Sequence, residues 1–157
     1  MKQSSVYDCQ VLSLSKIHNP AGNITIVEGE QNIPFNLRRI YYLYDIPGGE
    51  FRGGHAHIEL FQLIIAASGS FEVLLDDGQN KKIVRLNRPN FGLLVVPGIW
   101  EELFEFSSGA ICLVLASQVY EEKDYIRDYK SFFQYKKKLI NENDQQVWGI
   151  PSFGGGV

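Results

Sequence analysis

The sequence predicts an all-β fold, an antiparallel sandwich or barrel, followed by one C-terminal helix. Eight short segments rich in β-branched and aromatic residues follow one another along the chain. Pairs of Asn, Asp, Gly and Pro that favour turns separate these segments. A helical period of aromatic residues appears only after Tyr120. Short strands at this spacing are typical of antiparallel sheets.

The expected strands can be justified in order from their composition and from the turns between them. They lie at residues 11–17, 24–28, 39–45, 62–67, 70–76, 82–86, 92–96 and 110–117. The turns carry Asn19-Pro20, Pro47-Gly48-Gly49, Asp76-Asp77-Gly78, Arg88-Pro89-Asn90 and Pro97-Gly98. Asp77-Gly78 is the clearest hairpin turn, because it separates FEVLLDD from KKIVRL.

Segment 121–140, EEKDYIRDYKSFFQYKKKLI, is expected to be helical. Its aromatic stripe is interpreted as the face that packs on the barrel or on a neighbouring subunit. The run Lys136-Lys137-Lys138 is expected to be solvated. We therefore expect one domain over residues 1–140, which includes the helix, and a C-terminal tail over residues 141–157.

Composition limits which binding partners and which cellular compartment are expected for this protein. The formal net charge of −3, with both signs interspersed, gives no reason to expect nucleic acid or a membrane surface. Cys9 and Cys112 lie in apolar segments and are expected to be buried, inert thiols. The chain begins without a signal-peptide pattern, and no apolar run reaches about 18 residues. A cytoplasmic protein is expected.

The stretch GEFRGGHAHIELFQLIIAASG, residues 49–69, contains two of the three histidines. His55 and His57 are two residues apart in a strand-like run, so both side chains point to one face. A pair of hydrogen-bonded core histidines is the alternative. The spacing of Gly49, His55, His57, Gln62 and Gly69 resembles the first motif of the cupin superfamily, with Gln62 where Glu is usual.

Two arginines near the histidines are candidate ligands for an anion. Alternation along RRIYYLYDI places Arg39 and Tyr41 on one face, where Arg39 could hold a phosphate or carboxylate with two hydrogen bonds. A shift of register would make Tyr42 or Tyr44 the inward phenol instead. Arg52 precedes Gly53-Gly54, a pair that lets the backbone approach a ligand closely.

The second half of the cupin pattern departs from its usual form. GLLVVPGIWEELFEF has the expected Pro97-Gly98 turn but carries Glu101 where a histidine is usual. A metal site would have to use His55, His57, Gln62 and Glu101, and Gln is a weaker ligand than a carboxylate. No metal is therefore expected, and Gln62 is expected to bond to a histidine ring or a substrate hydroxyl.

A narrower resemblance covers about residues 24–133. The segments NIPFNLRRIYYLYDIPGGEFRGGHAH, GSFEVLLDDG, GLLVVPGIWEEL, LVLAS and DYIRDYKSF resemble the cupin-type sugar nucleotide 3,4-ketoisomerases, also called WxcM-like proteins. The resemblance implies a cytoplasmic homodimer with a double-stranded β-helix, or jelly-roll, fold. It implies that dTDP-4-keto-6-deoxyglucose is converted from the 4-keto to the 3-keto form, for dideoxy-aminosugar synthesis, without a metal or other cofactor.

Histidine chemistry fits this reaction. Moving a ketone to the neighbouring carbon requires a proton to leave one carbon and another to reach its neighbour through an enediol, and histidine exchanges protons near neutral pH. We expect His55 and His57, with Tyr41, to be catalytic, although the sequence does not indicate which histidine is the base. Substrate-binding residues are expected to be Arg39, Arg52, Gln62, Glu101 and Tyr44.

Two departures from the resemblance concern the sugar. Members of that group usually carry His or Arg at the position of Glu101, and Arg or Tyr near Ala21. A carboxylate changes both the local charge and the direction of hydrogen bonding, so the sequence leaves open the stereochemistry at C4 and the identity of the substrate. A sugar nucleotide binding protein without turnover and a metal-dependent cupin enzyme are the alternative functions.

Overall fold

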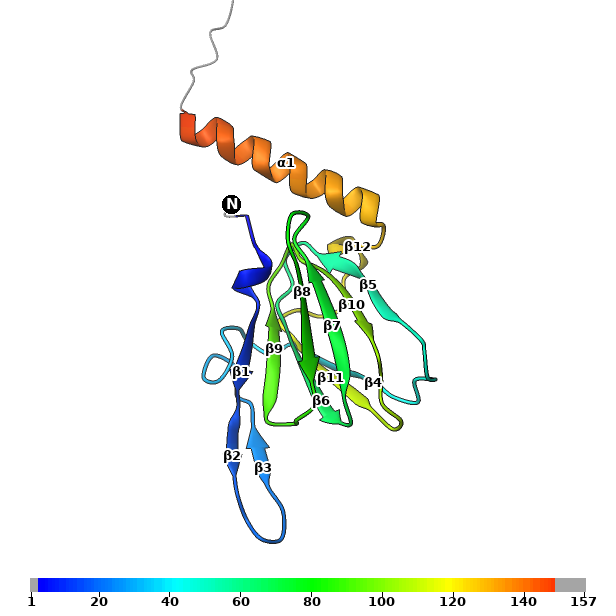
Figure 1. The fold of residues 1–157 in the computed structure, drawn as a ribbon. Helices are drawn as coiled ribbons and strands as arrows, with labels where there is room; N and C mark the ends of the chain where they lie inside the picture. Colours follow the sequence, from blue (N-terminus) through cyan, green and yellow to red (C-terminus); the bar gives the residue numbers. More distant parts are fainter. Residues whose placement is uncertain (1–2, 149–157) are drawn as a thin grey trace, which may run out of the picture.

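The computed structural model describes residues 3–148, which form two five-stranded antiparallel sheets with a helix across one end (Figure 1). The first sheet has the order β1-β9-β6-β11-β4, formed by Gln10–Ser13, Phe91–Val95, Gln62–Ser68, Ile111–Ala116 and Arg39–Leu43. The second has the order β12-β5-β10-β7-β8, formed by Tyr125–Ile126, Arg52–His57, Trp100–Phe104, Phe71–Asp76 and Lys81–Leu86. The expected all-β jelly-roll fold with one C-terminal helix is confirmed.

The main core lies between the two sheets. On β7, the fully buried Phe71, Val73 and Leu75 alternate with less buried neighbours, as a strand with one core face requires. They belong to the same cluster as Ile64 on β6 and Val114 on β11 of the other sheet. Each such side chain contributes roughly 1.5–3 kcal/mol by its removal from water.

Strand β6 is covered on both faces. Ile64 faces the main core, whereas Leu63 and Ile65 belong to a second cluster with Ile33 and Phe35. The segment before β4 therefore packs on the outer side of the first sheet. This double coverage explains why β6 reads as a continuous apolar run rather than an alternating one.

The expected Asp77-Gly78 hairpin joins β7 to β8. Asp77 Oδ1 accepts hydrogen bonds from the backbone N–H groups of Gln79 at 2.9 Å and Asn80 at 2.7 Å, and Gly78 has a φ of 89°. Asp77 Oδ2 also accepts from the Val6 N–H at 3.0 Å, in the short 3₁₀ helix η1 (Val6–Asp8). The turn therefore also holds the N-terminal segment.

The first part of the expected helix forms a short 3₁₀ helix and a two-residue strand instead. Glu122–Asp124 form the 3₁₀ helix η2, and Tyr125–Ile126 form β12, which pairs with β5. Asp124 Oδ1 accepts from the Glu59 N–H at 2.7 Å, and the Asp124 carbonyl accepts from the Ile58 N–H at 2.9 Å. These tertiary hydrogen bonds outweigh the helical spacing of the aromatic residues.

Helix α1 spans Tyr129–Trp148. Asp128 caps it, because its Oδ2 accepts from the Ser131 N–H at 2.8 Å. Phe132 is fully buried in a cluster with Trp100 of β10, which fixes the helix on the second sheet. Of the expected tail, residues 141–148 continue this helix, and residues 149–157 lie outside the described part of the chain.

The expectation that the three consecutive lysines are all solvated was wrong for Lys136. Its side chain is 2 % exposed, and its Nζ donates to the carbonyls of Ser4 at 2.8 Å and Gly98 at 2.9 Å. Two backbone acceptors compensate for burying the amine, as a buried charge requires. Lys137 and Lys138 are exposed as expected.

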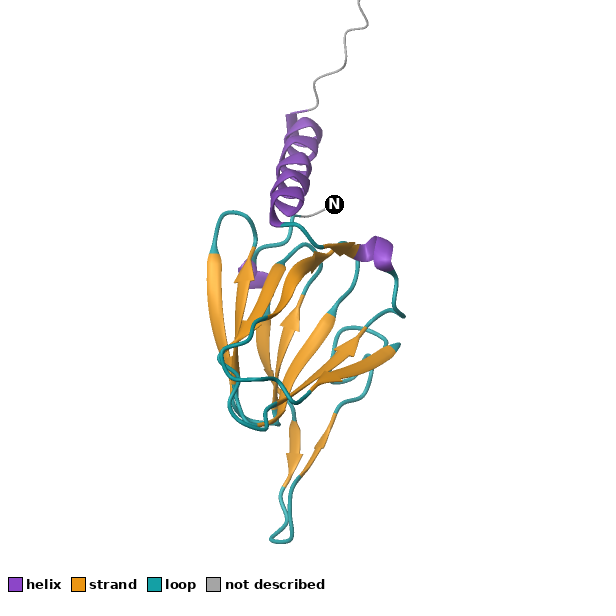
Figure 2. Ribbon diagram, turned by 90° about the vertical axis from the view of Figure 1, so that its right-hand side faces the viewer, coloured by secondary structure: helices purple, strands orange, loops and turns teal. Residues whose placement is uncertain are grey.

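The segment 11–17, expected as one strand, is divided between two. β1 ends at Ser13, Leu14 is buried, and Ser15–Ile17 form β2, which pairs with β3 (Ile24–Ile26). Figure 2 shows this β2–β3 hairpin projecting from the end of the molecule opposite α1. Its side chains are mostly exposed.

Both cysteines are buried and free, and burial raises the pKa of the Cys9 thiol to about 11. Inert thiols were expected, and this environment agrees with that expectation. Within residues 3–148, no helix is long and apolar enough to span a membrane.

Candidate active site

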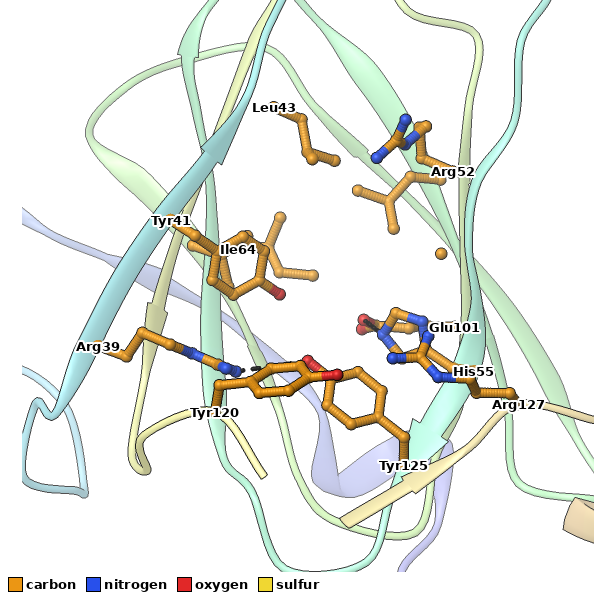
Figure 3. Close-up of a pocket in the computed structure, with 13 residues that line it drawn as sticks. Arg39, Tyr41, Leu43, Arg52, His55, Ile64, Glu101, Tyr120, Tyr125 and Arg127 are labelled. Atoms are coloured by element: carbon orange, nitrogen blue, oxygen red, sulfur yellow. Dashed lines mark hydrogen bonds and ion pairs between the residues drawn. The ribbon is translucent and has the colours of Figure 1, made fainter. Parts of the chain in front are cut away.

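A cavity of about 430 Å³ lies between the two sheets (Figure 3). Strands β4, β6 and β11 of the first sheet and β5, β10 and β12 of the second contribute to its lining. The apolar part consists of Leu43, Ile64, Leu103 and Val114. The polar part consists of Arg39, Tyr41, Arg52, His55, Glu101, Tyr120, Tyr125 and Arg127. Three arginines beside one histidine and one carboxylate suit an anionic ligand that also presents groups for proton transfer.

The two motif histidines share one face of β5 but have different surroundings. Their ring centroids are 5.0 Å apart. His55 lines the cavity, whereas His57 is 4 % exposed and does not. His57 Nδ1 lies 3.0 Å from Asp124 Oδ2, so this nitrogen donates to the carboxylate. Desolvation by burial lowers the pKa of His57, which keeps the ring neutral.

Glu101 on β10 is directly opposite His55 in the antiparallel pairing of β10 with β5. Its Oε1 lies 3.2 Å from His55 Nε2, and its Oε2 accepts from Gln62 Nε2 at 2.5 Å. Burial alone would raise the pKa of Glu101, but the contacts with His55 and Gln62 outweigh it and hold this pKa below its ordinary value. The residue is therefore a buried, ionised carboxylate beside the cavity histidine.

A β-bulge in strand β5 lies directly before His55 and affects the orientation of its side chain. The β5–β10 register shifts between Glu101 and Glu102, whose partners are His55 and Gly53, so Gly54 is the extra residue. Gly53 has a φ of 80°, and a Cβ there would lie 3.0 Å from the Glu101 carbonyl oxygen. The glycine pair was expected to admit a ligand. Gly53 lines the cavity, and its missing side chain also admits the neighbouring strand β10.

Tyr41 extends the polar network to β4. Its hydroxyl donates to Gln62 Oε1 at 3.2 Å, and burial raises its pKa, so the phenol stays protonated. Gln62 thus connects Tyr41 to Glu101. Gln62 was expected to bond to a histidine ring or a substrate hydroxyl. It bonds to Tyr41 and Glu101, and it does not reach a histidine ring because Glu101 lies between the amide and His55.

Arg39 reaches the cavity between three tyrosines. Its guanidinium carbon lies 5.3 Å from the Tyr41 ring centroid and 5.6 Å from that of Tyr120, and its Nη2 is 3.5 Å from the Tyr125 hydroxyl. Its Nε has no hydrogen-bond partner among the described residues. The guanidinium therefore retains donors for an incoming anion. Arg52 also lines the cavity, as expected.

Sequence reasoning missed Tyr120, Tyr125 and Arg127. Arg127 bonds to Glu122 at 2.7 and 3.0 Å and lies 4.2 Å from the Tyr125 ring centroid. The DYIRDY segment contained the signal, since its two-residue alternation brings Tyr125 and Arg127 to one face. Reading the segment as a helix concealed that alternation.

Three of the expected site residues are not part of the lining of this cavity: Tyr44, Gln62 and His57. Tyr44 follows β4 on the face of Tyr42, and both side chains are largely exposed, at 60 % and 58 %. No bulge interrupts the pairing of β4 with β11, so Tyr41 is the inward phenol. Placing Tyr44 at the site was therefore incorrect for this cavity. Ala21 lies in the exposed loop of the β2–β3 hairpin and is not among the residues that line the cavity.

Comparison with known proteins shows the family of this chain. The FdtA family model, described as WxcM-like, C-terminal, matches residues 7–137. The chain belongs to the FdtA family. One curated FdtA-family relative is the TDP-4-oxo-6-deoxy-alpha-D-glucose-3,4-oxoisomerase of Aneurinibacillus thermoaerophilus, which is 41 % identical over 135 residues, or 86 % of this chain and 97 % of that protein.

Solved structures similar to this FdtA-family chain include a 3,4-ketoisomerase from Helicobacter canadensis, with 43 % identity and a TM-score of 0.81 over 83 % of this chain and 98 % of that one. The sugar 3,4-ketoisomerase QdtA from Thermoanaerobacterium thermosaccharolyticum, in complex with TDP, has 36 % identity and a TM-score of 0.83, with coverage of 85 % and 98 %. A variant of QdtA was solved with TDP-4-keto-6-deoxyglucose, at 36 % identity and a TM-score of 0.82, with coverage of 84 % and 96 %.

Proposed function

We propose that this protein is a 3,4-ketoisomerase that moves the keto group of dTDP-4-keto-6-deoxyglucose from C4 to C3. The observation that carries the proposal is that His55 alone of the two motif histidines lines the cavity, beside the ionised Glu101. The activity named for its FdtA-family relatives supports the same reaction. The complexes of QdtA with TDP and a TDP-linked keto sugar support the substrate class.

In the proposed mechanism, His55 is the carbon base. It removes the proton from C3 of the sugar, the C3–H electrons form the C3=C4 double bond of an enediolate, and the C4 oxygen takes the negative charge. Collapse of this intermediate forms the C3 carbonyl. A proton is delivered to C4, and the O3 hydroxyl proton is transferred to O4. A positioned histidine typically contributes 10²–10⁴-fold to such proton transfer.

His57 and Tyr41 have supporting roles in this proposal. His57 is held neutral and oriented by Asp124 behind His55, so it steadies the first ring or passes protons rather than meeting the carbon. Tyr41 is a protonated donor at the cavity, suited to an oxygen that gains negative charge in the enediolate. Glu101 would contact the sugar hydroxyls, and Gln62, which is 1 % exposed and bonded to both Glu101 and Tyr41, would hold these two side chains in place.

The residues that would bind the nucleotide part of the substrate are identified by their charge. Arg39, Arg52 and Arg127 line the cavity and would bind the diphosphate, because guanidinium groups match phosphate oxygens with paired hydrogen bonds. Tyr120 and Tyr125 offer aromatic faces for thymine. The proposal places the reaction in the cytoplasm.

We also propose a homodimer. Three exposed isoleucines of the β2–β3 hairpin and three exposed apolar residues of the β4 edge lack cover within one chain: Ile17, Ile24, Ile26, Ile40, Tyr42 and Tyr44. Pairing between two copies would cover such an edge, and a two-fold axis is the commonest arrangement. Light scattering after gel filtration should give twice the mass of 17.8 kDa, and a monomer would contradict this part of the proposal.

The decisive experiment is proton NMR of the protein with fresh dTDP-4-keto-6-deoxyglucose in D₂O. The expected result is a 3-keto product with deuterium at C4. His55→Asn should abolish this incorporation, and His57→Asn should reduce it. If dTDP stabilises the protein against heat but no deuterium is incorporated, the chain binds sugar nucleotides without isomerising this one.

A further inference from the structure

Asp124, the last residue of η2, bonds to consecutive residues at the end of β5. Its Oδ2 accepts from His57 Nδ1 at 3.0 Å, and its Oδ1 accepts from the Glu59 N–H at 2.7 Å. Its carbonyl oxygen accepts from the Ile58 N–H at 2.9 Å. Asp124 is 8 % exposed and is not among the residues that line the cavity. Of these bonds, only the one to His57 reaches a side chain next to the site.

The bond to Asp124 determines which nitrogen of His57 carries the proton. A neutral imidazole has one N–H and one lone pair, and an ionised carboxylate can only accept. The proton of His57 is therefore on Nδ1, and the lone pair is on Nε2. Nε2 is buried and has no hydrogen-bond partner within residues 3–148. His57 thus presents no donor at Nε2.

The position of this proton matters because a second carboxylate lies close to the same ring. A ring nitrogen of His57 lies within 4.8 Å of a carboxylate oxygen of Glu101. Glu101 already has two partners, since its Oε1 is 3.2 Å from His55 Nε2 and its Oε2 accepts from Gln62. A proton on His57 Nε2 would be drawn to Glu101 and would compete with His55 for it. With the proton on Nδ1, this competition does not arise.

We propose that Asp124 is a positioning residue for catalysis, which keeps the proton of His57 on Nδ1 and so reserves Glu101 for His55. This role rests on the function proposed above, in which His55 is the carbon base beside Glu101. A carboxylate has a comparable role in catalytic triads, where it holds an imidazole in the productive tautomer. Here the oriented ring lies behind the base, so Asp124 acts on the reaction through His57.

The variant Asp124→Asn tests this role with little change of shape. The Glu59 N–H needs an acceptor, so the amide oxygen takes the place of Oδ1 and the NH₂ group faces His57 Nδ1. His57 must then accept at Nδ1 and carry its proton on Nε2. We expect kcat to fall at least about tenfold, less than the roughly 10⁴-fold loss in a triad whose histidine meets the substrate itself. KM should not change, because Asp124 does not line the cavity.

Nitrogen-15 NMR of the labelled full chain, without substrate and above neutral pH, measures the tautomer. The proton of His57 should be on Nδ1 in the wild type and on Nε2 in Asp124→Asn, and the spectrum of His57→Asn assigns the signals. Asp128→Asn is the matched control. It removes the same charge where the carboxylate caps α1, and it should change neither the tautomer nor kcat. A wild-type proton on Nε2 would overturn the proposal even if Asp124→Asn does not fold.

Turnover of dTDP-4-keto-6-deoxyglucose separates positioning from a purely structural role. In the His57→Asn background, Asp124→Asn should cause no further loss of kcat, because the carboxylate acts through His57. Equal losses in both backgrounds, or an unchanged kcat in the single variant, would overturn the proposal. Circular dichroism checks that each variant is folded. A wild-type protein that never isomerises this sugar would overturn the proposed function and the catalytic role with it, whereas the tautomer is decided by NMR independently.

Discussion

Glu101 on β10 faces His55 on β5 across a paired position, and Glu101 Oε1 lies 3.2 Å from His55 Nε2. The carboxylate is buried and ionised, and Gln62 holds its other oxygen. When His55 takes a proton from carbon, the imidazolium that forms has a negative partner already in place, without any rearrangement. This relationship has a measurable consequence for turnover.

Glu101→Gln should therefore lower kcat roughly 10²-fold, the lower end of the range for one positioned acid–base group. The amide keeps the size of the side chain but removes the charge beside His55. Steady-state kinetics with dTDP-4-keto-6-deoxyglucose measure the effect, and Glu102→Gln is the control. An unchanged kcat would show that the carboxylate has no part in proton transfer.

Tyr41→Phe should lower kcat by about 10²–10³-fold, the usual loss for one donor to a developing oxyanion. The phenol is protonated at neutral pH because burial raises its pKa, so it can donate throughout the reaction. Stability should fall by only about 1 kcal/mol, since one hydrogen bond to Gln62 is lost. Tyr42→Phe, on the exposed face of β4, should leave both quantities unchanged.

The stability of the protein should decrease as the pH falls below 6.5, and His57 should account for the decrease. Burial lowers its pKa below the ordinary value of 6.5, so between 6.5 and that lower pKa the unfolded chain binds a proton that the folded chain does not. The free energy of unfolding must then fall with pH in this window. Urea unfolding at pH 7.5 and 5.5 measures the difference, and His57→Gln should largely remove it.

Sequence patterns predicted the all-β fold, the Asp77-Gly78 hairpin and the cavity positions of Arg39, Tyr41 and His55. Those predictions depend on local properties, namely strand alternation and turn chemistry. Strand β10 was not predicted, because two adjacent glutamates in WEELF have low β-propensity. It forms because β5 and β7 supply hydrogen-bond partners on both sides.

The difference between His55 and His57 could not be predicted from their shared strand face. It arises because β12 pairs beside His57 and brings Asp124 to its ring, while the cavity opens beside His55. Those contacts join residues 67 positions apart in the chain. Local spacing contains no information about such partners. Lys136 illustrates the same limitation, since its carbonyl acceptors belong to the N-terminal segment and the Pro97-Gly98 turn.

Lys136→Met should destabilise the protein by about 1–3 kcal/mol, although the substitution preserves most of the aliphatic volume. The ammonium group bonds to the carbonyls of Ser4 and Gly98, and methionine leaves both without that donor in a buried position. Lys138→Met is the matched control. Its side chain is 78 % exposed and its ion pair with Glu142, at 3.9 Å, is one helical turn away, so the expected change is below about 0.5 kcal/mol. Urea unfolding of both variants measures the difference, and equal stabilities would mean that the buried amine does not fasten the helix to the N-terminal segment.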